Sequence, residues 1–225
     1  MKETEKIFLM TADGKKIAGL FRKPENPSFW VIFIHMRPAT KESWDEFAGE
    51  LINKNIASLA IDLRGHGESD GGPSGYLNDE NCNIKINDLK SAVIFLRSEG
   101  AEPENIIFIG ASIGANLVLK FMSENKDFKT AILFSPGLNF KKVSGEEAAE
   151  KISSEQRILF ISSRDDDRVL ENELETQKLF DLVPLDAEKE IVVYEKGGHG
   201  SEILKTEELP EIKETIINFI INKNK

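Results

Sequence analysis

Hydrophobic and polar positions along this chain form blocks that predict strands and helices in turn. Near-continuous apolar runs occupy residues 29–34, 56–63, 106–109, 131–134, 158–161 and 191–194, and apolar-rich runs at 6–11 and 16–22 are joined by an Asp-Gly pair. Runs without polar alternation are typical of strands covered on both faces. Asp-Gly between two such runs predicts an antiparallel hairpin. The pattern therefore predicts eight strands, the first two of them paired at a sheet edge.

Apolar residues between these runs recur at helical spacing, as Trp44, Phe47 and Leu51 do. The spacing predicts helices within residues 40–54, 86–96, 112–122, 170–183 and 212–220. Pro210 fits the first turn of the last of these, where its missing N–H has no helical partner. Strands that alternate with helices predict a mostly parallel, doubly wound eight-stranded sheet with helices on both faces. At 225 residues we expect one α/β domain over 1–225, with its active site at the carboxyl ends of the strands.

Composition and charge narrow the class of partner. The chain has 29 Lys and Arg against 39 Asp and Glu, and its net charge of −10 disfavours nucleic acid and anionic lipid. No apolar run reaches the length of a membrane span, and the acidic start MKETEKIFLM does not resemble a signal peptide. We therefore expect no membrane insertion and a cytoplasmic location. The single cysteine, Cys82, excludes an internal disulfide and a thiolate metal cluster.

One segment, residues 105–122, carries the first candidate chemistry. The apolar run ends in Gly110-Ala111-Ser112-Ile113-Gly114 and continues as a helical pattern. A G-x-S-x-G sequence between a strand and a helix is the context of a nucleophile elbow, where a sharp turn exposes the serine oxygen. Glycines on both sides of Ser112 have a steric reason, since side chains there would collide with neighbouring elements. Ser112 is therefore the predicted nucleophile.

A serine nucleophile needs a base, and the base needs an acid that orients it. In the order nucleophile, acid, histidine, only His199 of the three histidines follows Ser112, and it comes just after the last predicted strand. The run at 158–161 is followed by Asp165, Asp166 and Asp167, which lie at the same predicted sheet edge. One of these three carboxylates is expected to be the acid, and spacing alone leaves the choice open.

These residues together resemble the α/β-hydrolase superfamily over essentially the whole chain. Its acid commonly sits in a G-x-x-D-x-x-V pattern, and here Ser163 to Val169 matches with serine in place of glycine. The resemblance implies that Asp166 is the acid, and the replaced glycine keeps Asp165 as a second choice. The sequence DLRGHGES, residues 62–69, is similar to the family's D-x-R-G-x-G-x-S motif. That motif is structural in the family, which implies that His66 fixes a loop rather than acts in catalysis.

The end of the third strand departs from the family pattern. The family has His-Gly followed by the oxyanion-hole residue, whereas this chain has His35-Met36-Arg37. The resemblance implies that His35 is structural and that the backbone N–H groups of Arg37 and Ile113 form the oxyanion hole. Methionine in place of glycine leaves Met36 as an alternative donor. The Arg37 side chain either meets an anionic substrate group or, as we favour, points into solvent.

The small size and the short segment 137–156 resemble esterases of the dienelactone-hydrolase-like and serine-aminopeptidase-like groups, which have no large cap domain. The resemblance implies cleavage of small-molecule carboxylic esters with short to medium acyl chains, with neither metal nor organic cofactor. Plausible apolar pocket walls are Met36, Leu138, Phe140 and Val169. Two alternatives remain: the same triad acts on a peptide, thioester or lactone, or the protein is a non-catalytic binding protein with this fold. The sequence makes no prediction of oligomeric state.

Overall fold

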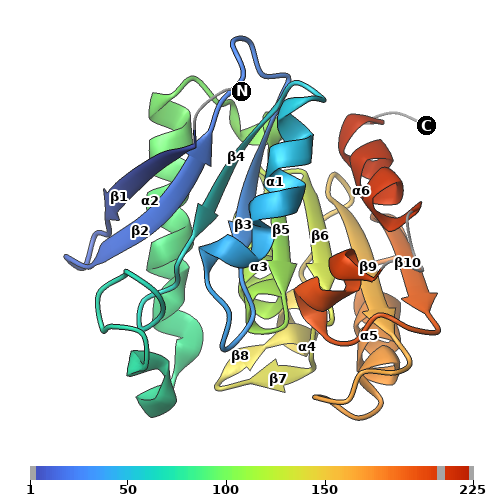
Figure 1. Cartoon of the computed structure of the whole chain (residues 1–225). Coiled ribbons are helices and arrows are strands. Elements are labelled where there is room, and N and C mark those ends of the chain that lie inside the picture. The colour runs from blue at the N-terminus through green and yellow to red at the C-terminus, as the bar shows by residue number, and fades with distance from the viewer. Residues whose placement is uncertain (1–3, 207–210, 223–225) are drawn as a thin grey trace.

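The computed structural model describes residues 4–206 and 211–222 and contains a twisted sheet of eight strands (Figure 1). Their order is β1-β2-β4-β3-β5-β6-β9-β10. The pairs β1·β2 and β2·β4 are antiparallel, and the other pairs in this sheet are parallel. The strands are β1 (Glu5–Met10), β2 (Lys16–Arg22), β3 (Phe29–Ile34), β4 (Ile56–Ile61), β5 (Ile106–Ala111), β6 (Thr130–Phe134), β9 (Arg157–Ser163) and β10 (Glu188–Tyr194). The predicted doubly wound sheet with its N-terminal hairpin is thereby confirmed.

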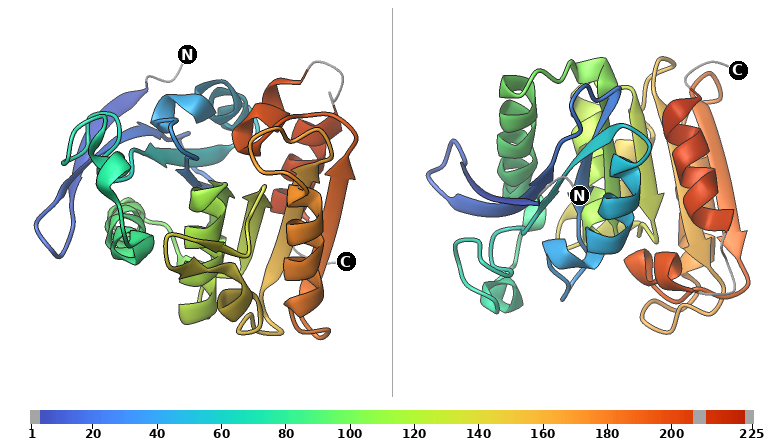
Figure 2. Two further views of the ribbon diagram at one scale, coloured as in Figure 1. Left: turned by 90° about the horizontal axis from the view of Figure 1, so that it is seen from below. Right: turned by 45° about the horizontal axis from the view of Figure 1, so that its top comes forward.

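Helices cover both faces of this sheet, as the view from below in Figure 2 shows. Helices α1 (Asp45–Ile52) and α6 (Glu211–Ile221) lie on one face, and α2 (Ile86–Ser98), α3 (Ile113–Glu124) and α5 (Asn172–Leu182) lie on the other. The predicted start of α6 at Pro210 falls outside the described residues. Within residues 4–206 and 211–222, no helix is long and apolar enough to cross a membrane.

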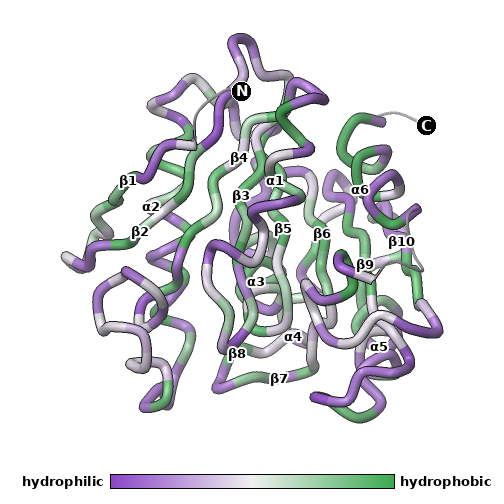
Figure 3. The backbone as a smooth tube through the Cα atoms, viewed as in Figure 1, coloured by the Kyte–Doolittle hydropathy of each residue, from purple (hydrophilic) through white to green (hydrophobic). Residues whose placement is uncertain are grey.

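Two apolar cores explain why the central strands are apolar at nearly every position. Successive side chains of a strand point to opposite faces, so Ile32 and Ile34 join the core under α2 and α3. Val31 and Phe33 join the core under α1 and α6. Figure 3 shows the resulting concentration of hydrophobic residues along the middle strands. A strand buried on both faces cannot alternate polar and apolar residues, and this is the pattern that identified the strands in the sequence.

The segment between β6 and β9 holds small elements that the sequence pattern did not reveal. A two-stranded antiparallel ribbon, β7 (Asn139–Phe140) and β8 (Val143–Ser144), leads into the short helix α4 (Gly145–Ala149). The segment adds no large cap, in agreement with the prediction. It lies beside the start of α3 at the lower end of the sheet in Figure 1, where it borders the site described next.

Helix α5 forms where it was expected, but part of its predicted buried face is wrong. The apolar residues at helical spacing in 170–183 predict a face made of Leu170, Leu174, Leu179 and Val183. Leu179 and Val183 are buried, whereas Leu170 precedes the helix and Leu174 lies on its exposed side. The residues that turn toward the sheet in the first two turns are Asn172 and Thr176. The apolar spacing was therefore misleading at this end of the helix, because polar residues occupy the inner face.

Candidate active site

Ser112 lies at the sharp turn between β5 and α3, with φ 51° and ψ −119°. This is a strained conformation for a residue with a side chain. The flanking glycines have the steric reason that the sequence suggested. A Cβ on Gly110 would lie 2.4 Å from the Gly114 carbonyl oxygen, and a Cβ on Gly114 would lie 2.4 Å from the Ile34 carbonyl oxygen. The close packing of α3 against the ends of β3 and β5 therefore depends on both glycines.

His199 and Asp166 lie in contact at the same sheet edge. His199 Nδ1 is 2.5 Å from Asp166 Oδ2, and both side chains are buried. The other carboxylate oxygen, Oδ1, accepts hydrogen bonds from the backbone N–H groups of Arg168 and Val169, each at 3.0 Å. Because a carboxylate only accepts, the imidazole proton of this contact belongs on Nδ1. His199 Nε2 is then left as an acceptor, and His199 and Ser112 line one pocket.

Asp165, the second candidate for the acid, points to the backbone rather than to the imidazole. Its Oδ1 accepts a hydrogen bond from Gly198 N at 2.9 Å, and that N–H holds the pKa of Asp165 below its ordinary value. Ser163, the residue in place of the family glycine, donates from Oγ to Gly198 O at 2.6 Å and lies 3.0 Å from Asp165 Oδ1. The two side chains hold the peptide groups on either side of Gly198, immediately before His199.

Three further residues that sequence reasoning missed connect the loops of the site. Arg168 forms an ion pair with Glu202, and Glu202 Oε2 accepts the backbone N–H of His199 at 3.2 Å. Ser135, at the end of β6 with φ 46°, accepts the backbone N–H of Gly200 at 2.9 Å through its Oγ. The contacts of Arg168 with Glu202 and of Ser135 with Gly200 join residues far apart in the chain, so the local sequence carries no signal for them. Glu202 lies only three residues after His199, which is the spacing of a capping box.

The expected oxyanion donors lie just after the end of β3 and at the start of α3. Ile113 is the first residue of α3, where backbone N–H groups lack helical partners. In the described part of the chain, neither Met36 N nor Arg37 N donates a hydrogen bond, so both candidates remain open. The Met36 side chain is buried, and a Cβ on Gly200 would lie 2.7 Å from its Sδ. Methionine at the family's glycine position therefore packs against the loop that carries His199.

The side chain of Arg37 is half-buried and lies against two aromatic rings, in contrast to the expected orientation into solvent. Its guanidinium carbon lies 4.6 Å from the ring centre of Tyr76 and 5.5 Å from that of Phe140. Such cation–π contacts hold the arginine against Tyr76 and against Phe140, which lines the pocket. Its backbone oxygen lies 3.5 Å from Arg168 Nη1, which adds a contact to the loop of Asp166.

The other two histidines belong to a separate buried network. His35 Nδ1 donates to Met36 O at 2.8 Å and its Nε2 accepts Leu63 N at 3.0 Å, while burial lowers its pKa to about 4. His66 stacks on Tyr76 with ring centres 4.4 Å apart, and burial lowers its pKa to about 3. Both rings are therefore neutral near pH 7, and neither lines the pocket of Ser112, which fits the structural roles that the resemblance implied.

The pocket beside Ser112 has a volume of about 150 Å³. It is lined by Ser112, Ile113, Asn116, Ser135, Gly137, Asn139, Phe140, Val169, Asn172, Glu175 and His199. Of the predicted apolar walls, Phe140 and Val169 line it, whereas Met36 and Leu138 do not. Within residues 4–206 and 211–222, no cluster of His, Cys, Asp and Glu is arranged to hold a metal ion.

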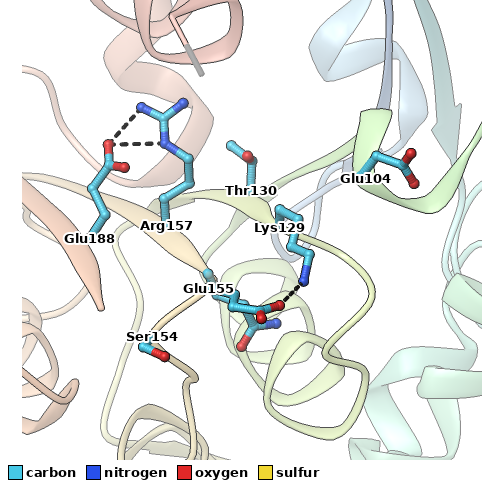
Figure 4. Close-up of a pocket in the computed structure, with 8 residues that line it drawn as sticks. Glu104, Lys129, Thr130, Ser154, Glu155, Arg157 and Glu188 are labelled. Carbon is cyan, nitrogen blue, oxygen red and sulfur yellow. Dashed lines mark hydrogen bonds and ion pairs between the residues drawn. The ribbon is translucent and has the colours of Figure 1, made fainter. Parts of the chain in front are cut away.

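A larger pocket, of about 410 Å³, lies at the opposite end of the sheet (Figure 4). It opens at the amino ends of β6, β9 and β10, where Arg157 pairs with Glu188 at 2.8 Å and Lys129 pairs with Glu155 at 2.5 Å. These charges neutralise one another across its walls. Because Ser112 and His199 lie at the carboxyl ends of the strands, this pocket is separate from their site.

Comparison with known proteins places the chain in a family. A family model described as serine aminopeptidase, S33, matches residues 25–158, a span that includes Ser112 and ends before Asp166 and His199. The uncharacterized protein YfhR of Salmonella typhi is 32% identical over 125 residues, which cover 52% of this chain and 40% of that protein. Thiohydrolase aneE of Aspergillus aculeatus is 34% identical over 113 residues, which cover 49% of this chain and 35% of that protein. The chain spans about two fifths or less of the length of these curated relatives.

The fold extends this similarity to the remainder of the sequence. The esterase Pf2001 of Pyrococcus furiosus superposes with a TM-score of 0.77 at 22% sequence identity, over 97% of this chain and 92% of the esterase. At that sequence identity the superposition shows the fold alone and does not identify a substrate. Since the family model matches more than half of the sequence and the sheet has the matching topology, the chain belongs to the serine aminopeptidase S33 family of the α/β-hydrolase superfamily.

Proposed function

We propose that this protein is a serine hydrolase that cleaves small-molecule carboxylic esters through an acyl-enzyme formed on Ser112. The observation that carries the proposal is the contact of His199 Nδ1 with Asp166 Oδ2 at 2.5 Å, made by a histidine that lines the same pocket as Ser112. A serine on an elbow, an imidazole and a carboxylate in this order form the machinery for acyl transfer. The net charge of −10 supports a small-molecule substrate over nucleic acid.

In the proposed reaction, Ser112 Oγ attacks the ester carbonyl carbon while His199 Nε2 takes the hydroxyl proton. Asp166 keeps the Nδ1–H tautomer in place and stabilises the imidazolium that forms. The backbone N–H groups of Ile113 and Arg37 donate hydrogen bonds to the carbonyl oxygen and stabilise the negative charge that develops on it, with Met36 as the alternative to Arg37.

The tetrahedral intermediate then collapses, and His199 returns the proton to the departing alcohol. The acyl group remains on Ser112 until His199 takes a proton from water, which attacks the acyl carbon and releases the carboxylic acid. Every step uses groups of the protein and water alone, so the proposal requires neither a metal ion nor an organic cofactor.

The bond that is cleaved has a second candidate, the thioester. The related protein aneE is named a thiohydrolase, and a thioester presents the same carbonyl to the same nucleophile. The description of the family as serine aminopeptidases similarly makes a peptide bond a candidate. Matched ester, thioester and peptide anilide substrates, compared by kcat/KM, separate these bonds. Esters are expected to give the highest value, and a higher value for either competitor replaces our choice.

The test of the mechanism is Ser112→Ala measured with a short-chain p-nitrophenyl ester. We expect kcat to fall by about 10³-fold or more, because the nucleophile is lost, while thermal unfolding is unchanged. A fluorophosphonate probe should label the wild-type protein once and should not label the variant. A wild-type protein that neither turns over the ester nor reacts with the probe would instead be a binding protein with this fold.

A further inference from the structure

In the part of the chain that the structure describes, the pocket beside Ser112 holds one buried acceptor without a donor, on Asn172, and one carboxylate without a cation, on Glu175. Asn172, at the start of α5, is 1% exposed, and its Nδ2 donates to Pro136 O at 3.0 Å. That bond fixes the orientation of the amide, since a carbonyl oxygen at the Nδ2 position could not donate. Asn172 Oδ1 then has no hydrogen-bond partner among residues 4–206 and 211–222. A buried carbonyl oxygen without a donor is uncommon and calls for an explanation.

Glu175, one helical turn further along α5, lines the same pocket. Its Oε2 accepts Leu138 N at 3.1 Å, which turns the carboxylate toward the segment that follows β6. Within the described residues it makes no ion pair with Lys, Arg or His. A carboxylate that faces a small pocket without a cation has unused acceptor capacity.

Asn116, a second amide that lines the pocket, behaves differently. Asn116 uses both ends of its side chain on one residue: Nδ2 donates to Gly137 O at 2.7 Å, and Oδ1 accepts Gly137 N at 2.9 Å. It is therefore satisfied and holds the pocket wall in place. The contrast shows that Asn172 and Glu175 supply acceptors beyond what the protein itself uses.

We infer that the substrate of this pocket is an ester whose short acyl chain carries a hydrogen-bond donor, either a hydroxyl or an ammonium group. The inference rests on the proposed function and names its substrate class. The volume of about 150 Å³ is small beside the roughly 300–1,000 Å³ of pockets for drug-sized ligands, which limits the acyl group to a few heavy atoms. Phe140 and Val169 contact its methylene groups, and the donor at its end binds Asn172 Oδ1 and Glu175.

Three p-nitrophenyl esters of nearly equal size test this inference: butyryl, 3-hydroxypropanoyl and β-alanyl. They differ only in ending with a methyl, a hydroxyl or an ammonium group. Each kcat/KM is divided by the rate constant of uncatalysed hydrolysis, so that differences in intrinsic reactivity cancel. We expect at least one polar ester to exceed the butyryl ester by about tenfold, as an added hydrogen bond to a charged acceptor predicts. The faster of the two identifies the donor.

Two variants tie that preference to the pocket. Glu175→Gln removes the charge with little change in size, and Asn172→Leu removes the unpartnered oxygen. Each variant is expected to reduce the ratio of the corrected kcat/KM of the polar ester to that of the butyryl ester by about tenfold. Glu173→Gln, which makes the same charge change on the same helix outside the pocket lining, should leave the ratio unchanged. Glu175→Gln keeps the test valid if Asn172→Leu does not fold.

A butyryl ester that is cleaved fastest, or a ratio that falls equally in Glu175→Gln and Glu173→Gln, would overturn the inference. Absence of turnover with all three esters, together with absence of probe labelling at Ser112, would contradict the proposed function as well. The two failures are therefore distinguishable.

Discussion

The three histidines of this protein are equally buried, yet they occupy two different kinds of environment. His35, His66 and His199 are 0%, 1% and 3% exposed. Within the described residues, neither His35 nor His66 forms a hydrogen bond to a carboxylate, and burial is the main cause that lowers their pKa values to about 4 and about 3. His199 contacts Asp166 and borders a pocket. Burial therefore does not distinguish the proposed base, whereas a carboxylate on one ring nitrogen and a pocket beside the ring do.

The two environments also differ in how their carboxylates are used. Asp62 Oδ1 accepts the backbone N–H of Lys41, and its Oδ2 accepts both Lys41 Nζ and the backbone N–H of Glu68. Gly67 fits closely over this carboxylate, since a Cβ there would lie 2.2 Å from Asp62 Oδ2. The contacts of Asp62 join its own loop to the turn that begins at Lys41, whereas Asp166 directs one oxygen to its loop and the other to His199.

The largest expected effect is on the catalytic side of this comparison. Asp166→Asn should lower kcat by about 10⁴-fold, because an amide N–H facing Nδ1 favours the wrong imidazole tautomer. The asparagine oxygen can still accept the N–H groups of Arg168 and Val169, so we expect urea unfolding to change little. The exposed neighbour provides the control: Asp167→Asn should leave kcat unchanged. If both variants retain wild-type kcat, Asp166 is not the acid.

The next effect is on stability and comes from the structural side. Asp62→Asn leaves the buried ammonium group of Lys41 without its buried partner, and we expect the free energy of unfolding to fall by about 3 kcal/mol. The exposed Asp70 in the same loop provides the control, and Asp70→Asn should cost much less in the same urea titration. A loss of esterase turnover in Asp62→Asn with unchanged stability would reverse the roles that we assign to the two carboxylates.

The fold could be predicted from the sequence because its strands are apolar on both faces. Periodicity misplaced part of α5 for a physical reason: Asn172 and Thr176 face inward beside the pocket, and Leu174 faces solvent. A prediction from apolar periodicity assumes that the inward positions of a helix are apolar. This assumption fails where the helix borders a polar site. Two polar residues at i and i+4 at the start of a helix that follows a catalytic loop are the signal that could have found this face.

The site could be predicted in part. The G-x-S-x-G motif predicted Ser112 as the nucleophile, and the order nucleophile, acid, histidine along the chain predicted His199 as the base. Spacing could not separate Asp165 from Asp166, because both residues follow the same strand. The conformation of the turn after that strand decides which partner each carboxylate reaches. That turn directs Asp166 to the imidazole and Asp165 to Gly198 N. The oxyanion donors, the single-domain organisation and the cytoplasmic location stay predictions.

The pH dependence of stability sharpens the contrast between the histidines. Burial lowers the pKa of His66 to about 3, below the ordinary value of about 6.5, so the unfolded chain binds a proton that the folded protein does not. The free energy of unfolding therefore falls as pH falls between these values, by about 1.4 kcal/mol per pH unit. In His66→Gln the slope of the free energy of unfolding against pH should decrease by the equivalent of one proton. The contribution of His35 to that slope should remain. Parallel curves for the two proteins between pH 6.5 and 4 would contradict the assignment.

The smallest effect that we expect separates the two adjacent carboxylates. Asp165 holds Gly198 N without touching the imidazole, so Asp165→Asn should lower kcat only about tenfold, by loosening the segment before His199. An asparagine oxygen can still accept the Gly198 N–H, which limits the loss because only the charge of the acceptor is removed. Asp165→Ala removes the acceptor altogether and should lower kcat further, with KM for a p-nitrophenyl ester nearly constant. If Asp165→Asn loses as much activity as Asp166→Asn, the imidazole takes its orientation from both carboxylates, and the division of roles between them is wrong.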